Sequence, residues 1–109
     1  MIRRKGKPRF KEGRDPEYLA WIRTLPCLVP QVTTGGPKTQ PCQGVTVAAH
    51  VKTRGAMGPD RGNAIPMCWG HHDEQTISGI STFERRYAGE TGWMKSWAHI
   101  LEHERSLNE

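Results

Sequence analysis

Three cysteines and a histidine stand at spacings that suit a tetrahedral metal site, namely Cys27, Cys42, Cys68 and His71. Thiolates and imidazoles are ligands that zinc accepts, and four protein ligands close a structural zinc site. Cys68 and His71 form a C-x2-H pair, whereas Cys42 has to return to Cys27 across a polar surface loop over residues 30–43. These residues predict a structural zinc site. The alternative is that the cysteines fill the core, where thiols are common.

Two further histidines and an asparagine could carry hydrolytic chemistry. His50 ends a short β-branched run, Asn63 begins the next run, and His72 follows the predicted zinc pair. Hydrolysis of a phosphodiester needs a base that takes a proton from water and a cation that neutralises the developing charge. Histidine suits both tasks near neutral pH, so we expect His50 to be the base and His72 to hold a hydrolytic metal ion. Asn63 could then orient the base through its amide. Taken singly, each residue could also be an ordinary surface or turn residue.

Apolar periodicity predicts the elements that must position these side chains. Asp15 and Pro16 are typical of a helix start, and the amphipathic pattern that follows ends at Pro26. Residues 45–51 are short, β-branched and bounded by glycine-rich segments, and residues 63–67 could pair with them. We therefore expect one helix followed by a short antiparallel hairpin.

The remainder of the chain is predicted to be helical. A brief helix after Cys68 carries the two neighbouring histidines, Ser81 or Thr82 could cap another helix that runs through Tyr87, and Thr91 could cap the last one. In the last helix one stripe is apolar, consisting of Trp93, Met94, Trp97, Ile100 and Leu101. Such a stripe indicates a helix that packs on a core.

The run over residues 48–75, AAHVKTRGAMGPDRGNAIPMCWGHHDEQ, resembles the HNH endonucleases of the ββα-metal superfamily, especially small bacterial and phage versions. The earlier LPCLV and later STFERRY segments extend the resemblance over about residues 18–87. It implies an α+β fold built on a ββα-metal finger, a short antiparallel hairpin plus a helix, with flanking helices. The family's general base, hairpin-stabilising asparagine and metal-ligating histidine match His50, Asn63 and His72. Its four structural zinc ligands match Cys27, Cys42, Cys68 and His71.

The resemblance also implies hydrolysis of DNA by a histidine-activated water and one catalytic divalent metal ion, such as Mg2+, Mn2+, Ni2+ or Zn2+. Two positions depart from the family pattern. Many members have Asp or His where Ala49 stands, and related small sequences have a second His where Thr76 stands. Asp60 and Asp73 are the nearest carboxylates that could join His72 on the metal, and we favour Asp60. Its alternative is an ordinary turn aspartate.

Basic residues point to a phosphate-rich partner. The chain has 16 Lys and Arg against 11 Asp and Glu, a net charge of +5. Residues 1–14 hold Arg3, Arg4, Lys5, Lys7, Arg9, Lys11 and Arg14. Such side chains neutralise phosphates and release counterions, so we expect DNA as the partner, with Lys52, Arg54 and Arg61 holding phosphates beside the histidines. The alternative for residues 1–14 is a solvated basic tail.

Length and composition allow a single domain. The chain has 109 residues, with 12 glycines and 8 prolines, and a mean hydropathy of -0.71. We expect residues 1–14 to be a flexible arm and residues 15–109 to be one HNH nuclease domain that includes the C-terminal helices. No segment looks able to span a membrane, and reduced cysteines beside histidines suit the cytoplasm of a bacterial or phage-infected cell. The oligomeric state stays open.

Two other functions compete with a nuclease. A zinc-stabilised DNA-binding module serving a phage recombination or packaging machine would bind DNA in a salt-sensitive way without cleavage. A zinc-dependent interaction protein, suggested by Trp69 and the aromatic last helix, would have no affinity for DNA. Nicking and binding assays separate the three functions.

Overall fold

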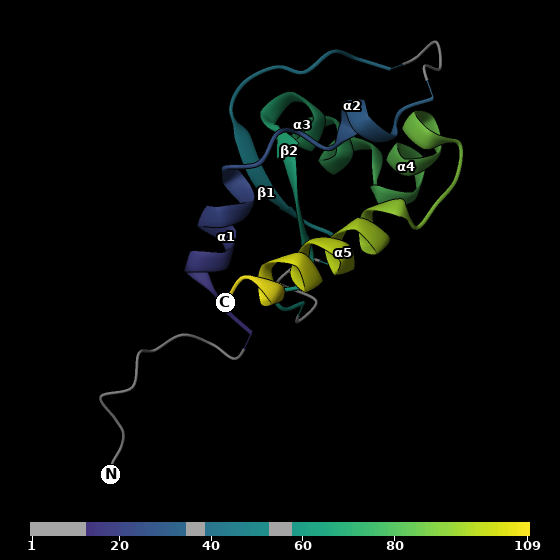
Figure 1. Cartoon of the computed structure of the whole chain (residues 1–109). Helices are drawn as coiled ribbons and strands as arrows, with labels where there is room; N and C mark the ends of the chain where they lie inside the picture. The colour runs from purple at the N-terminus through teal and green to yellow at the C-terminus, as the bar shows by residue number, and fades with distance from the viewer. Residues whose placement is uncertain (1–12, 35–38, 53–57) are drawn as a thin grey trace.

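The computed structural model describes residues 13–34, 39–52 and 58–109. In these residues a two-stranded antiparallel hairpin is surrounded by helices (Figure 1). The elements are α1 (Pro16–Arg23), α2 (Val29–Val32), β1 (Thr46–His50), β2 (Ala64–Cys68), α3 (Trp69–Ser78), α4 (Ile80–Ala88) and α5 (Trp93–Leu107). The predicted α+β class and the hairpin are confirmed. Most of the predicted basic arm, residues 1–12, lies outside the described residues.

The hairpin separates the two sets of candidate residues. Thr46 pairs with Cys68 and His50 pairs with Ala64, so His50 and Cys68 lie at opposite ends of the hairpin. Every residue of β2 is buried. Because alternate residues of a strand face opposite sides, β2 is covered on both faces, and α1, α3 and α5 all contact it. The buried strand β2 therefore holds Cys68 at one end of the hairpin and the partner of His50, Ala64, at the other.

Helix α1 begins where the sequence predicts. Asp15 Oδ1 accepts a hydrogen bond of 3.1 Å from the backbone N–H of Tyr18, and Pro16 occupies the first turn. Tyr18 and Ile22 are buried against the hairpin. They join a core whose other large members are Leu28, Val29, Ile65, Met67, Phe83, Tyr87, Trp93, Met94 and Leu101.

Helices α4 and α5 begin at other residues than the sequence predicts. Gly79 and Gly92 stand at the caps that we assigned to Ser81 or Thr82 and to Thr91. Gly79 joins α3 to α4 at φ 90°, a conformation that side chains rarely adopt. The start of α5 has no side-chain cap of its own; instead the buried Glu84 of α4 accepts a 2.8 Å hydrogen bond from the backbone N–H of Met94. At α5 a tertiary contact therefore replaces the predicted local cap.

The apolar stripe of α5 is only partly as predicted. Trp93, Met94 and Leu101 are buried, but Ile100 is 49% exposed and Ala98 lies in the core in its place.

The short helix α2 was also not expected, because the stretch after Pro30 is polar. Val29 at its start is buried. Ala98 and Val29 are buried by contacts with other elements, and such contacts cannot be predicted from apolar periodicity along the chain.

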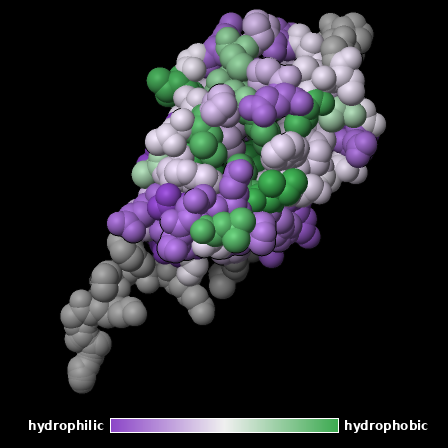
Figure 2. Space-filling model, viewed as in Figure 1, coloured by the Kyte–Doolittle hydropathy of each residue, from purple (hydrophilic) through white to green (hydrophobic). Residues whose placement is uncertain are grey.

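Charged side chains gather where the start of α1 lies beside the C-terminal end of α5. In Figure 2 the hydrophilic residues cluster over the start of α1 and the C-terminal end of α5. Arg61 lies at this place, 2.8 Å from Glu109 and 3.6 Å from both Asp15 and Glu102.

No helix in the described part of the chain is long and apolar enough to cross a membrane.

Candidate metal centre and histidine site

Four side chains from distant parts of the chain form one compact cluster. The ligand atoms of Cys27, Cys42, Cys68 and His71 all lie within 4.8 Å of one another. His71 Nδ1 is 3.7, 3.9 and 3.1 Å from the sulfurs of Cys27, Cys42 and Cys68 respectively. A tetrahedral zinc ion with ordinary bond lengths would separate sulfur from nitrogen by about 3.5 Å. The donor set and its spacing therefore fit a metal ion, as the sequence predicted.

The start of α3 shapes the buried half of this cluster. Cys68 is the N-cap of α3, and its sulfur accepts the backbone N–H of His71 at 3.4 Å and that of Gln43 at 3.3 Å. Gly70 also donates its N–H to the Gln43 carbonyl, at 2.9 Å. Burial opposes ionisation of Cys68, but these backbone N–H groups hold the pKa of the thiol below its usual value. These contacts therefore favour the thiolate form of Cys68 more than burial alone would allow.

The His71 ring is oriented by a second contact. Its Nε2 donates a 2.7 Å hydrogen bond to the Gln40 carbonyl oxygen, so Nδ1 is left to face the sulfurs. The ring is buried, and it packs edge-on against Tyr87 at 5.2 Å between ring centroids. Gln40 could not be predicted from the sequence, because it acts through its backbone carbonyl, which every residue type has.

The other two thiols depend on a cation for ionisation. Burial raises the pKa of Cys27, and burial together with the neighbouring thiols raises that of Cys42 to about 12. Since metal ligands must be deprotonated, binding of a cation at this cluster would release protons at neutral pH.

At the other end of the hairpin, His50 contacts a buried carboxylate. Its Nε2 lies 2.9 Å from Asp60 Oδ1, and Asp60 is only 2% exposed. The second oxygen of Asp60 accepts the backbone N–H of Asp15 at 2.6 Å. The sequence suggested Asp60 as a possible metal ligand; in the structure its carboxylate contacts His50 and the backbone at the start of α1. Only tertiary structure brings these three segments together.

Asn63 ties together the two sides of the loop that follows His50. Its Oδ1 accepts the backbone N–H of Lys52 at 2.7 Å, while its Nδ2 donates to the carbonyls of Lys52 at 2.7 Å and Pro59 at 2.8 Å. A methyl group on Gly58 would lie 2.4 Å from the Lys52 oxygen and 2.7 Å from Asn63 Nδ2. The loop is closed by an amide clamp, meaning the Asn63 side chain and its three bonds.

His72 stands apart from both groups. It is part-exposed on α3, and in the described residues it belongs to no cluster of three or more potential ligands. No hydrogen bond or ion pair joins it to His50 in that part of the chain. Ala49 is fully buried, and the Thr76 hydroxyl donates to the His72 carbonyl at 3.0 Å. In residues 13–34, 39–52 and 58–109, no group of three or more potential ligands includes His72 to make up for these two departures.

The predicted phosphate contacts have different surroundings. Lys52 is exposed, two residues beyond His50. Arg61 lies among three carboxylates and over the ring of Tyr18, with its guanidinium carbon 5.2 Å from the ring centroid. Arg54 lies outside the described residues. Of the predicted phosphate contacts that the structure describes, Lys52 is the better placed.

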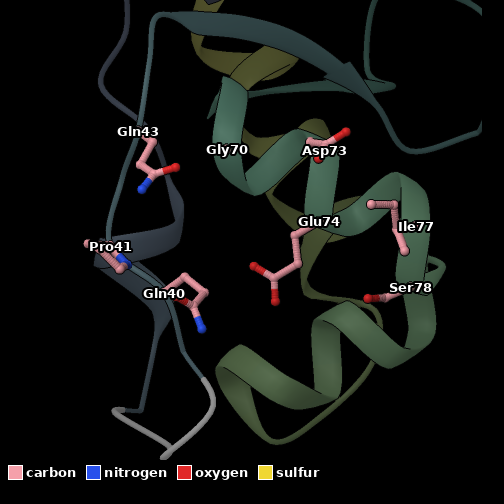
Figure 3. Close-up of a pocket in the computed structure, with 8 residues that line it drawn as sticks. All are labelled: Gln40, Pro41, Gln43, Gly70, Asp73, Glu74, Ile77 and Ser78. Atoms are coloured by element: carbon pink, nitrogen blue, oxygen red, sulfur yellow. The ribbon is translucent and has the colours of Figure 1, made fainter.

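A shallow cavity adjoins the outer side of the metal cluster. Figure 3 shows Glu74 and Ile77 of α3 facing the Gln40–Gln43 segment across it. Its volume of about 250 Å³ is below the usual range of ligand pockets. The Glu74 carboxylate already accepts hydrogen bonds from Arg86 and from the Tyr87 hydroxyl. Of the two carboxylates that line the cavity, Asp73 and Glu74, that of Glu74 is therefore already engaged within the protein.

The geometry of these sites stands without support from related proteins. No protein-family model, curated protein or solved structure matches the chain.

Proposed function

We propose that this chain is a DNA endonuclease of the HNH type, stabilised by a structural zinc ion and dependent on a second divalent metal. In this proposal β1, β2 and α3 form a ββα-metal finger, and zinc occupies the cluster of Cys27, Cys42, Cys68 and His71. The single observation that carries the proposal is the environment of the His50 side chain. It ends β1 beside a buried carboxylate and an amide clamp, and its ring is 17% exposed.

This environment suits a base better than a packing residue. A histidine that only fills space needs no buried anionic partner, whereas a general base needs a fixed ring with access to water. His50 takes a proton from a water molecule, and the resulting nucleophile attacks the scissile phosphorus. Asn63 keeps the loop beyond His50 closed, and the exposed Lys52 neutralises a neighbouring phosphate.

The described residues fit the two metals to different degrees. The cluster supplies a complete zinc ligand set, whereas His72 is the one protein ligand that we assign to the catalytic ion. Such an ion would neutralise charge on the scissile phosphate. With so few protein ligands, we expect it to bind chiefly in the presence of DNA, whose phosphate oxygens complete its coordination.

A plasmid nicking assay tests the proposal. Purified protein is incubated with supercoiled DNA and Mg2+, Mn2+, Ni2+ or Zn2+, alongside His50→Ala and the control His103→Ala. His103 is exposed on α5, so its variant should cut like the wild type. His50→Ala should cut at least about 100-fold more slowly, the usual contribution of a general base. Failure of the wild type with all four metals, or equal cutting by His50→Ala, would contradict the proposal.

A second function is favoured by the surroundings of His72. Because Ala49 is buried and the Thr76 hydroxyl is bonded to the backbone, the chain could be a zinc-stabilised DNA-binding module without catalysis. This alternative predicts binding that weakens steeply with salt and no cleavage with any metal. The same protein preparation, examined by fluorescence anisotropy on a labelled duplex, separates the two functions.

A further inference from the structure

We infer that Asp60 is a positioning residue that fixes His50 in the Nε2–H tautomer, so that Nδ1 is the ring nitrogen that accepts a proton. The inference rests on the proposed function of His50, but its structural content is measurable without any cleavage.

Asp60 is held as a double acceptor. Its Oδ2 accepts the Asp15 N–H at 2.6 Å, and its own backbone N–H donates to the Gly13 carbonyl at 2.8 Å. Asp15 is the N-cap of α1, so the carboxylate lies at the positive end of that helix. An ionised carboxylate can only accept hydrogen bonds. The 2.9 Å contact with His50 Nε2 therefore requires a proton on that nitrogen.

The proton on Nε2 determines the role of the other ring nitrogen. A neutral imidazole carries one proton, so Nδ1 has a free lone pair. Nothing in residues 13–34, 39–52 or 58–109 forms a hydrogen bond with His50 Nδ1. In the reaction, a water proton moves to Nδ1, the water oxygen bonds to phosphorus, and the bond from phosphorus to the leaving oxygen breaks. The imidazolium keeps its Nε2–H on Asp60, and bulk water later removes the proton from Nδ1 and protonates the leaving oxygen.

Replacement of Asp60 by asparagine should reverse the tautomer. An amide has one accepting and one donating end, and the Asp15 N–H can only donate. The amide oxygen must therefore face Asp15, which turns the NH2 group toward His50 Nε2. Two donors cannot face each other, and a ring proton moves more easily than a backbone one. His50 would then carry its proton on Nδ1, where it blocks attack by water.

Nitrogen-15 NMR of the zinc-loaded full chain at pH 8 tests this inference. Long-range proton–nitrogen correlations identify the tautomer of each ring, and His50→Gln assigns the His50 signals. Wild type should show a protonated Nε2 and an unprotonated Nδ1, and Asp60→Asn should show the reverse. The matched control Glu104→Gln removes a carboxylate from an exposed position on α5 and should leave the wild-type pattern. In nicking assays Asp60→Asn should lose about 100-fold or more in rate at saturating DNA, with unchanged DNA affinity.

Each result has a clear meaning. An Nδ1–H tautomer in the wild type overturns the inference, and so does an unchanged His50 tautomer in folded Asp60→Asn. If Asp60→Asn does not fold, the wild-type spectrum alone decides. If the tautomers behave as expected but the wild type never cuts DNA, the proposed nuclease fails while the inferred tautomer stands. A rate loss in Asp60→Asn without a change of tautomer would show that Asp60 acts only through general stability.

Discussion

Removal of the amide clamp by Asn63→Ala should cost about 3 kcal/mol of folding free energy. The Asn63 side chain is 7% exposed and makes hydrogen bonds of 2.7, 2.7 and 2.8 Å with the backbone of Lys52 and Pro59. Each such bond contributes about 1 kcal/mol net, and loss of the amide leaves its partners without their donors or acceptor. A domain of this size has about 5–15 kcal/mol in total, so the variant should still fold.

Urea unfolding of the zinc-loaded protein, followed by tryptophan fluorescence, measures this loss. Asn108→Ala is the matched control, because Asn108 is an exposed asparagine with one side-chain bond, to the Glu104 carbonyl at 3.0 Å. Its effect should be within about 0.5 kcal/mol of zero. Asn63→Asp tests the direction of the bonds: it keeps the acceptor for the Lys52 N–H but sets a carboxylate against two carbonyls. We expect it to be at least as destabilising as alanine.

The reasoning would be refuted if Asn63→Ala lost less than about 1 kcal/mol, or no more than Asn108→Ala. Such a result would mean that water replaces all three bonds and that the loop beyond His50 is not held by Asn63. A lower midpoint with an unchanged dependence on urea concentration would attribute the effect to stability alone.

Three other predictions follow from single substitutions, and two of them compare a pair of similar residues. His71→Asn should release the structural metal, measured by elemental analysis, and lower the melting temperature. His72→Asn should retain the structural metal and the wild-type melting temperature but abolish nicking. Metal loss from both variants would contradict the assignment of His71, rather than His72, to the structural site. Gly58→Ala sets a methyl 2.4 Å from the Lys52 oxygen and should cost about 2 kcal/mol in urea unfolding, so a neutral effect would argue against the tight closure of the loop. Lys52→Ala should reduce the salt dependence of DNA binding by about one phosphate contact, whereas Arg61→Ala should leave it unchanged and cost at most about 1 kcal/mol in stability. The opposite ranking would mean that Arg61 leaves its carboxylates to bind DNA.

The cluster of Cys27, Cys42, Cys68 and His71 was predictable because residue types alone mark a potential metal site. Few side chains other than cysteine and histidine form such sets, and the C-x2-H pair at a helix start already fixes half of the geometry. The hairpin was predictable for a similar reason, because short β-branched runs bounded by glycine-rich segments have few other uses. Residue identity alone was sufficient for both.

The partner of His50 could not be predicted in this way. Asp60 lies in a loop and contacts segments 45 residues earlier and 10 residues earlier in the chain, and no periodic pattern encodes such contacts. The same limit explains the cap of α5. The local sequence offered Thr91, whereas the N–H of Met94 is satisfied by Glu84 of the preceding helix. Polar groups that act across elements are visible only once the elements are placed.

The neighbouring histidines of α3 show how one element could serve two sites. Successive residues of a helix point about 100° apart, so while His71 faces the sulfurs, His72 must face another direction. The position of His71 in the cysteine cluster thereby sets the direction of His72, which is not itself part of that cluster. His50 is held independently, by Asp60 and by the amide clamp at the other end of the hairpin. Loss of the structural metal should therefore displace His72 first, whereas the His50 tautomer should persist for as long as the hairpin stays folded.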